Sequence, residues 1–599
     1  MKKNSFLPLI ASALVLIPLM FSHSCANTTQ APTGGKKDSI PPLIVNIEPL
    51  PGVLNFPLEK GKIVFTFNEY VKTDKAQSIF LSPPQAKRPK SRIKGKSLIV
   101  EFEEPLSPNT TYTLDLNDAV SDNNENNKFP GFTFVFSTGD TIDTLFTTGV
   151  VLDCNTLAPV EGATVMLYSD HADSAIFLRR PDVAARTDKW GYFVLPYLRD
   201  TAYRLYAVQD ASSNNIYDPE EDLIAFSDSL MQPVWAVGDT IPELLKYDMT
   251  DTLGCEARRV AHTLLLFREK PTQQYIKNKA RTGLRSAYVS FHAPYAWIDS
   301  LWFGGFRADE VISQFNTTQD SLELWLNSRE DFPDTLHLFM NYRRTDSLGI
   351  LTPKLEHLKL PLEPDLKKKY SRRNRRNLEH EDTVCVFKLT ASGDRIEQYG
   401  FELEFKSPII YENFDSLVFR NLNPKQKEAF GTFTVTRDST NLRRYTIMPN
   451  EELQKGYEYF LKVPQGAFRD IDGFYSDSTE VKVSLPTDET LSTLSAVFTG
   501  VDGKYIVDLL DEKMSGTIRS FVINSDRTLV FPYLKEGRYC LRITSDINEN
   551  SVVDTGNLLE HRQPELVKFV LFSGDKFLNM PKSTELEQQI DIKAMFGNE

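Results

Sequence analysis

Short apolar segments, separated by glycine, proline, asparagine and serine, recur along almost the whole chain and constrain its fold more than any other feature. Residues 63–67, 97–102, 111–116 and 132–136 are examples, each rich in β-branched and aromatic side chains. Strands of this length between turn residues are typical of β-sandwiches. Because 599 residues exceed what one hydrophobic core serves, we expect an all-β, multi-domain string of sandwiches.

The first sandwich carries recognisable motifs. They are the Pro41-Pro42 pair, the strand 63–67 followed by Asn68-Glu69, the segment 106–112, and the closing Phe-Val-Phe-Ser-Thr-Gly at 134–139. Here the sequence resembles the S-layer-type bacterial Ig-like domain that opens many Bacteroidota lipoproteins. The resemblance implies an Ig-like sandwich at residues 43–140 and says little about activity, because this fold hosts many roles.

A second module follows at residues 145–230. Its segments 148–151, 159–165 and 187–193 come in the order of a transthyretin-like or carboxypeptidase-regulatory-like sandwich, which they resemble. Such a module implies a structural spacer or a binding surface.

The chain then repeats this pair. Residues 193–205 align without a gap with residues 529–541, through a shared Pro-Tyr-Leu core followed by Tyr and Leu. In a looser echo, 401–405 resembles 63–67 and 456–461 resembles 109–114. We therefore expect diverged copies of both modules, with another sandwich between the two pairs. The expected ranges are a middle sandwich at 255–362, a basic linker at 363–383, a second Ig-like domain at 384–487 and a second transthyretin-like domain at 490–575.

The N-terminus indicates export. Two lysines precede an apolar run at residues 6–21, which is short for a membrane span, and Ser24-Cys25 follows. Residues 1–24 resemble a bacterial lipoprotein signal peptide, which implies diacylation (palmitate) of Cys25 and an outer-membrane location, with the face undecided. An ordinary secretory signal is the alternative. The polar, proline-containing residues 25–42 predict a flexible stalk.

Charge excludes one class of partner. The net charge of −13 argues against nucleic acid, since phosphate binding needs a basic surface. Residues 367–376 are strongly basic within this acidic chain, with seven cations in ten residues. A solvated linker is the simpler interpretation, and contact with anionic lipid or an acidic partner is the functional one. The cations are Lys367, Lys368, Lys369, Arg372, Arg373, Arg375 and Arg376.

A polar loop follows the repeated strand in both copies. Its oxygen-bearing residues have the spacing of a calcium loop, in which alternate side chains point inward around one cation. However, position six is not glycine, and Asn and Asp also occupy hairpin loops because they cap backbone groups. A structural calcium ion and a self-capped turn both remain open. The candidate ligands are Asp210, Ser212, Asn214, Asp218 and Glu221 in the first loop, and Asp546, Asn548, Asn550 and Asp554 in the second.

Catalytic motifs are missing from the sequence. It contains no Gly-x-Ser-x-Gly elbow, His-Glu-x-x-His, phosphate-binding Gly-x-x-x-x-Gly-Lys-Ser/Thr loop or Cys-x-x-Cys, so we expect no enzyme. The spacing of the remaining cysteines fits neither a zinc ribbon nor a dense disulfide scaffold. Buried free thiols are favoured, with one disulfide as the alternative. These cysteines are Cys154, Cys255, Cys385 and Cys540.

Two functions remain. One is a non-catalytic scaffold or accessory subunit that docks on an outer-membrane protein complex, including one that assembles or exports envelope proteins. The other is a carbohydrate-binding accessory lipoprotein whose exposed tryptophans stack on sugars. Trp302 and Trp325 lie within apolar strands, so we expect both in the core. The other tryptophans are Trp190, Trp235 and Trp297.

Overall fold

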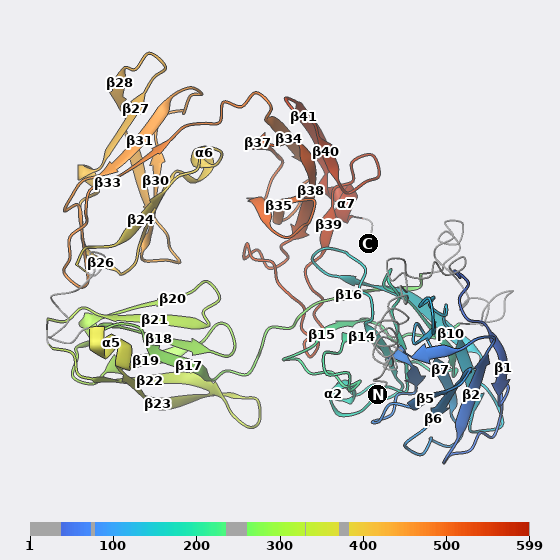
Figure 1. Ribbon diagram of the computed structural model, residues 1–599. Coiled ribbons are helices and arrows are strands. Elements are labelled where there is room, and N and C mark those ends of the chain that lie inside the picture. Colours follow the sequence, from blue (N-terminus) through green and yellow to red (C-terminus); the bar gives the residue numbers. More distant parts are fainter. Residues whose placement is uncertain (1–37, 74–77, 235–259, 330, 370–382, 598–599) are drawn as a thin grey trace, which may run out of the picture.

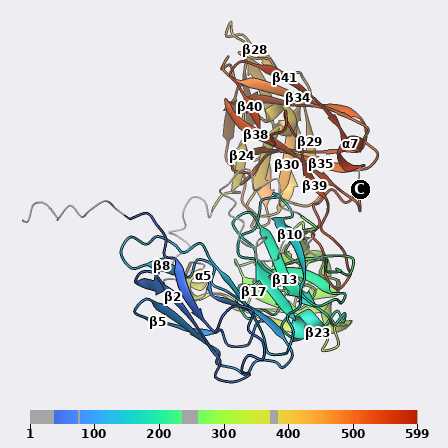
Figure 2. The same ribbon diagram turned by 90° about the vertical axis from the view of Figure 1, so that its right-hand side faces the viewer.

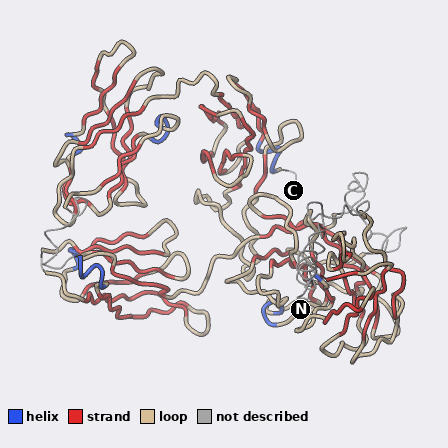
Figure 3. Tube along the Cα trace, viewed as in Figure 1, coloured by secondary structure: helices blue, strands red, loops and turns tan. Residues whose placement is uncertain are grey.

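The computed structural model describes residues 38–73, 78–234, 260–329, 331–369 and 383–597, and all structural statements below concern these residues. They form five β-sandwiches, which we number modules 1 to 5 in chain order (Figures 1 and 3). The all-β, multi-domain fold expected from the sequence is confirmed. Within this part of the chain, no helix is both long and apolar enough to cross a membrane.

Module 1, residues 38–140, is the Ig-like sandwich. Its strands are β1 (Ile44–Glu48), β2 (Lys62–Phe67), β3 (Val71–Thr73), β4 (Phe80–Ser82), β5 (Lys90–Lys94), β6 (Ser97–Glu101), β7 (Thr111–Asp115), β8 (Val120–Asp122) and β9 (Thr133–Ser137). The sheets are β1-β2-β6-β5 and β4-β7-β9, with β3 paired to β8. Alternate residues of β2 are buried, and Phe65 meets Phe134 of the opposite sheet edge-on, with ring centroids 5.8 Å apart. The alternation read from the sequence therefore builds this core.

Module 2, residues 145–234 and 260–269, is the sandwich for which the sequence predicts a transthyretin-like fold. Its elements are β10 (Leu145–Asp153), β11 (Thr164–Tyr168), α2 (Ala175–Leu178), β12 (Val183–Arg186), β13 (Tyr192–Leu198), β14 (Arg204–Gln209), β15 (Leu223–Phe226) and β16 (His262–Leu266). The sheets are β13-β10-β16 and β12-β11-β14-β15. β16 pairs with β10 in parallel, and Gly149 lies opposite His262. A Cβ at position 149 would lie 2.4 Å from the His262 carbonyl oxygen, so this approach requires glycine.

Module 3, residues 270–362, is a sandwich whose strand order differs from those of modules 1 and 2. A short helix follows it directly. The elements are β17 (Ile276–Arg281), β18 (Ser286–Phe291), β19 (Ile298–Phe303), η2 (Ala308–Glu310), β20 (Val311–Phe315), β21 (Ser321–Leu326), β22 (Thr335–Thr345), β23 (Leu351–Pro361) and α5 (Pro364–Lys369). The sheets are β17-β18-β21-β20 and β19-β22-β23.

Module 4, residues 384–487, repeats the strand order of module 1. Its elements are β24 (Phe387–Thr390), α6 (Ile396–Tyr399), β25 (Phe401–Phe405), β26 (Ile409–Glu412), η5 (Phe414–Ser416), β27 (Val418–Leu422), β28 (Glu428–Phe430), β29 (Phe433–Arg437), β30 (Arg444–Pro449), β31 (Glu458–Val463), β32 (Phe468–Asp470) and β33 (Thr479–Val483). The sheets β24-β25-β30-β29 and β28-β27-β31-β33 and the pair β26-β32 correspond to those of module 1, with β28 added.

Module 5, residues 490–597, repeats module 2. Its elements are β34 (Ser492–Thr499), β35 (Tyr505–Asp511), β36 (Thr517–Ile523), β37 (Arg527–Leu534), β38 (Gly537–Ser545), β39 (Val567–Phe569), β40 (Leu578–Met580), β41 (Glu585–Asp591) and α7 (Ile592–Phe596). The sheets β37-β34-β41 and β36-β35-β38-β39 match those of module 2, and β41 again pairs in parallel with the first strand.

The repetition extends to single residues. In the Ig-like modules, the hydroxyl oxygens of Tyr112 and Tyr459 each accept a hydrogen bond from a backbone N–H five residues upstream, at 2.8 and 2.6 Å. In modules 2 and 5, Tyr197 and Tyr533 each lie at a bulge, with φ of 58° and 61°. Positive φ is costly for tyrosine, so the same bulge at the aligned position supports the duplication.

Two expected ranges need correction. The ranges 145–230 and 490–575 both omit the parallel strand that completes each sandwich, β16 in module 2 and β41 in module 5. β16 falls inside the range 255–362 assigned to the middle sandwich, yet it hydrogen-bonds to module 2. Its partner strand lies more than a hundred residues earlier, so no local sequence pattern connects the two.

Candidate functional site: the polar loops and the contact between modules 5 and 2

The first polar loop joins β14 to β15 and caps its own backbone. Asp210 accepts a hydrogen bond from the N–H of Asn215 at 2.6 Å, and the buried Asp222 accepts from Ala211 and Asp218, both at 2.9 Å. Burial, together with the neighbouring Asp210 and Asp218 carboxylates, raises the pKa of Asp222. The self-capped turn left open by the sequence is therefore present. The other candidate ligands in this loop, Ser212, Asn214 and Glu221, are exposed.

The second loop, between β38 and β39, has the same construction. Asp546 accepts from the N–H of Ser551 at 2.7 Å, and Glu565 accepts from Ile547 and Asp554 at 3.1 and 2.9 Å. Burial, with help from the two aspartates, raises the pKa of Glu565, as it does for Asp222. Glu565 therefore accepts the backbone hydrogen bonds that Asp222 accepts in the first loop. Asp222 follows Asp210 by 12 residues, whereas Glu565 follows Asp546 by 19, so the second loop is seven residues longer.

Three side chains donate hydrogen bonds to the Asp554 carboxylate. Lys270 Nζ lies 2.7 Å from one carboxylate oxygen, and the side-chain amides of Asn548 and Asn550 donate to the other at 2.7 Å each. Burial alone would raise its pKa, but these donors hold the pKa of Asp554 below its usual value. A calcium ion here would have to displace an ammonium group, so the first loop is the better candidate. Among the described residues, no group of three or more His, Cys, Asp or Glu is arranged to hold a metal ion, and calcium stays a prediction.

The longer second loop docks on module 2. Leu558, which is 3% exposed, packs into an apolar cluster on the outer face of the sheet that contains β11 and β14. Its N–H donates to Glu269 at 2.6 Å, and the other oxygen of Glu269 accepts from the Tyr217 hydroxyl at 2.6 Å. Gly556 lies against Phe267, where a Cβ would come within 2.5 Å of the ring. Apolar packing and a bridging carboxylate hold module 5 on module 2, and the Lys270–Asp554 ion pair adds a contact with the first residue of module 3.

The two copies have diverged at the face involved. In module 2, the outward side chains Met166, Tyr168 and Tyr206 are buried in the cluster that receives Leu558. At the position aligned with Tyr206, module 5 has Arg542, which donates two hydrogen bonds to Asp508 at 2.7 and 3.3 Å. The face is therefore apolar in module 2 and carries an ion pair in module 5, where Arg542 also donates to the Asn155 carbonyl oxygen of module 2 at 3.5 Å.

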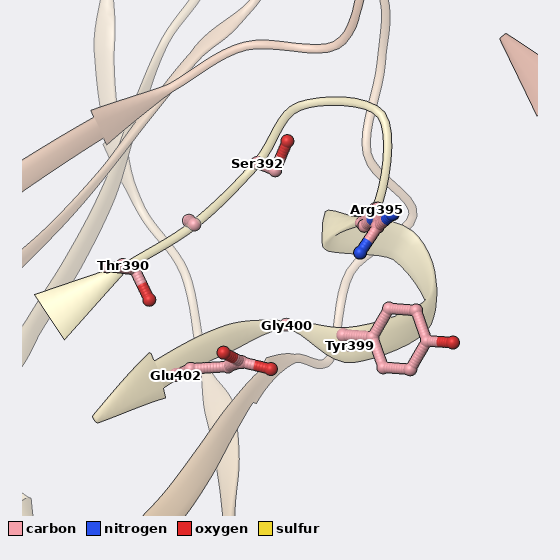
Figure 4. A pocket seen from close by; sticks show the side chains of 7 residues that line it. Thr390, Ser392, Arg395, Tyr399, Gly400 and Glu402 are labelled. Atoms are coloured by element: carbon pink, nitrogen blue, oxygen red, sulfur yellow. The ribbon is translucent and has the colours of Figure 1, made fainter. Parts of the chain in front are cut away.

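A separate cavity of about 250 Å³ lies in module 4 between β24 and β25 (Figure 4). Glu402 and Arg395 line it together with Tyr399, and Arg395 also donates to the carbonyl oxygen of Ile518 in module 5 at 3.2 Å. Its lining contains neither histidine nor cysteine, and the lining Ser392 donates from its hydroxyl to the Asp394 carboxylate.

The tryptophans divide into buried and exposed groups. Trp325 is 5% exposed, as expected for a core residue. The expectation for Trp302 is wrong: it is 39% exposed and stacks on Phe339 of the neighbouring strand, with ring centroids 5.4 Å apart. Trp297 is 64% exposed. Trp190 is half-buried beneath Lys189, and Trp235 lies outside the described residues.

Other predicted residues lie apart from this contact. Lys367 pairs with Asp334, and Lys368 and Lys369 belong to α5. The predicted lipidation residue Cys25, the cysteine Cys255 and the four arginines of the basic segment lie outside the described residues. Burial raises the pKa of three free thiols to about 11, 12 and 11: Cys154, Cys385 and Cys540.

A family model agrees with the fold of module 1. Residues 38–138 match the family model of the bacterial Ig-like domain. No curated protein matches the chain. Among solved structures, the S-layer protein rSbsC is 11% identical, with 90% of this chain and 67% of that one covered at a TM-score of 0.15. BcpA, the major pilin subunit of Bacillus cereus, is 8% identical, with coverage of 75% and 99% and a TM-score of 0.10. SGBP-B of the Bacteroides ovatus mixed-linkage glucan utilization locus, in complex with a mixed-linkage heptasaccharide, is 8% identical, with coverage of 66% and 88% and a TM-score of 0.16. At such TM-scores these likenesses carry no argument about function.

Proposed function

We propose that the protein is a non-catalytic lipoprotein, anchored in the outer membrane through Cys25, that serves as a scaffold or accessory subunit of an envelope protein complex. The signal-like N-terminus, the polar stalk and the absence of catalytic motifs from the sequence support this proposal. The Ig-like module and the duplicated sandwiches supply the surfaces, because loops and strand edges of sandwiches are ready docking sites.

The observation that carries the proposal is the contact of module 5 with module 2, which closes modules 2 to 5 on themselves. Figure 2 shows modules 4 and 5 stacked above modules 1 to 3. Each neighbouring pair in the circuit is joined by polar contacts at 2.6–3.2 Å. These contacts are His292–Glu220 between modules 3 and 2, Arg443–Glu323 between modules 4 and 3, and Tyr533–Glu397 between modules 5 and 4.

A closed circuit suits a scaffold for a physical reason. A linear string of sandwiches bends at each linker, whereas a closed set keeps its loops in fixed relative positions and loses less entropy when a partner docks. Module 1 is held to this body as well, since the N–H of Ala184 donates to Ser82 Oγ at 2.9 Å in a buried position.

Affinity purification from detergent-solubilised membranes tests the proposal. We expect a membrane-protein partner in stoichiometric amount, and we expect Cys25→Ala to release the protein into the soluble fraction. Equal membrane retention of the Cys25→Ala variant, or purification without any partner, would contradict the proposal.

Carbohydrate binding is the second candidate, and the exposed Trp297 favours it. The Arg343 guanidinium lies 5.6 Å from its ring centroid, and an aromatic face next to an arginine suits a sugar ring with polar substituents. Trp297→Ala should abolish retention on immobilised glycans. Tyr70→Ala is the matched control, because Tyr70 is also 64% exposed. Equal retention of both variants would remove this candidate.

A further inference from the structure

A cavity of about 660 Å³ opens at the side of module 5 that faces module 2. It lies between β39 and β41, which are edge strands of the two opposing sheets, so it reaches the interior where the sandwich does not close. Val570 and Ile590, 4% and 3% exposed, line it from the core of module 5. Leu157 of module 2 lines the opposite side, so both modules contribute to the cavity.

Helix α7 also lines this cavity and is fixed by two hydrogen bonds. Lys568 Nζ donates to the carbonyl oxygen of Met595 at 2.6 Å, and Asp591 caps the helix by accepting from the N–H of Ala594 at 3.0 Å. These two charged groups are therefore engaged with the protein.

One cation in the lining has no carboxylate partner. Lys576 Nζ lies 5.6 and 5.3 Å from the ring centroids of Phe569 and Phe577, and among the described residues it forms no ion pair. Beside it, Leu571 is 63% exposed. An apolar cavity with a single unpaired ammonium group matches a ligand with an apolar body and one negative charge.

We propose that this cavity binds an amphipathic monoanion of the fatty-acid class, with its acyl chain against Val570, Ile590 and Leu157 and its carboxylate at Lys576. The volume is in the ordinary range for small-molecule sites, about 300–1,000 Å³. The acyl chain removes apolar surface from water, and the carboxylate accepts a charge-assisted hydrogen bond from the ammonium. This site goes beyond the scaffold role and does not depend on it.

Titration calorimetry with dodecanoate on residues 26–599, which lack the predicted signal peptide and lipidation site and are kept free of detergent, tests the proposal. We expect saturable binding below the micelle concentration, weakened about tenfold in Lys576→Gln through loss of the charged hydrogen bond. Lys513→Gln is the matched control, because Lys513 is exposed in the same module and does not line the cavity. Dodecanol, which has no charge, should bind the wild type and Lys576→Gln equally.

A second variant guards against a misleading result. Leu571→Glu places a negative charge beside the mouth at an exposed position that tolerates substitution, and should weaken dodecanoate more than dodecanol. Equal dodecanoate affinity for the wild type, Lys576→Gln and Leu571→Glu, or no saturable binding to the wild type, would overturn the proposal. Membrane anchoring and partner capture would be unaffected, so its failure is separate from failure of the scaffold function.

Discussion

Replacing Leu558 with alanine should open the contact between modules 5 and 2. The side chain is 3% exposed and belongs to the apolar cluster of module 2, not to the core of module 5. Burial of this kind makes leucine-to-alanine changes cost about 2–5 kcal/mol, and about 2.7 kcal/mol lowers the ratio of closed to open molecules about 100-fold. The stability of module 5 itself should not change.

Hydrogen exchange and small-angle scattering measure this opening. The amide of Leu558, which donates to Glu269 in the closed molecule, should lose protection, and the radius of gyration should rise. Leu559→Ala is the matched control, because its side chain is 65% exposed and its loss should change neither quantity. If Leu558→Ala behaves like Leu559→Ala, or if it lowers the melting temperature of module 5 alone, the assignment of Leu558 to the contact is refuted.

Three further perturbations follow from the same geometry. The lowered pKa of Asp554 means that its ionised form stabilises the contact. This stabilisation is complete above the pKa of Asp554 in the unfolded chain, about 3.9, and is lost as pH falls through the lowered pKa of the folded protein. Scattering should therefore show closure from neutral pH down to about pH 4 and opening below it, whereas Lys270→Met, which removes the partner, should flatten this dependence. Calcium should bind the first loop and raise the melting temperature, Asp210→Asn should abolish the rise, and calorimetry showing no binding to the wild type would reject the metal. Tyr112→Phe and Tyr459→Phe should each cost about 1–3 kcal/mol in denaturant unfolding, since each leaves a backbone N–H without its acceptor, and costs near zero would contradict the shared role.

The duplication could be predicted because both copies retain the same short sequence motifs. The aligned Pro-Tyr-Leu segments become the same bulged strand, with the same left-handed tyrosine, in modules 2 and 5. The parallel strands β16 and β41 were missed because parallel pairing joins segments far apart in the chain and leaves no turn signal between them. Trp302 was misplaced because an apolar strand does not reveal which of its faces is covered.

The docking of module 5 left a signal in the sequence that local reasoning did not use. β11 reads Thr-Val-Met-Leu-Tyr, which is apolar on both faces, and a strand buried on both sides needs a cover beyond its own sandwich. The second polar loop is also seven residues longer than the first between equivalent carboxylates. The inserted residues cover the apolar face. The sequence does not reveal, however, which of the adjacent Leu558 and Leu559 is buried against it.

The position of β41 has a consequence for biosynthesis. This strand covers one flank of β34, yet Glu585, where β41 begins, follows Ser492, where β34 begins, by 93 residues. Until synthesis of the chain has passed β41, the backbone of β34 remains unpaired on that side and can associate with other chains. A chain that stops before Glu585 would therefore keep β34 as an open sheet edge, the kind of surface through which β-proteins aggregate.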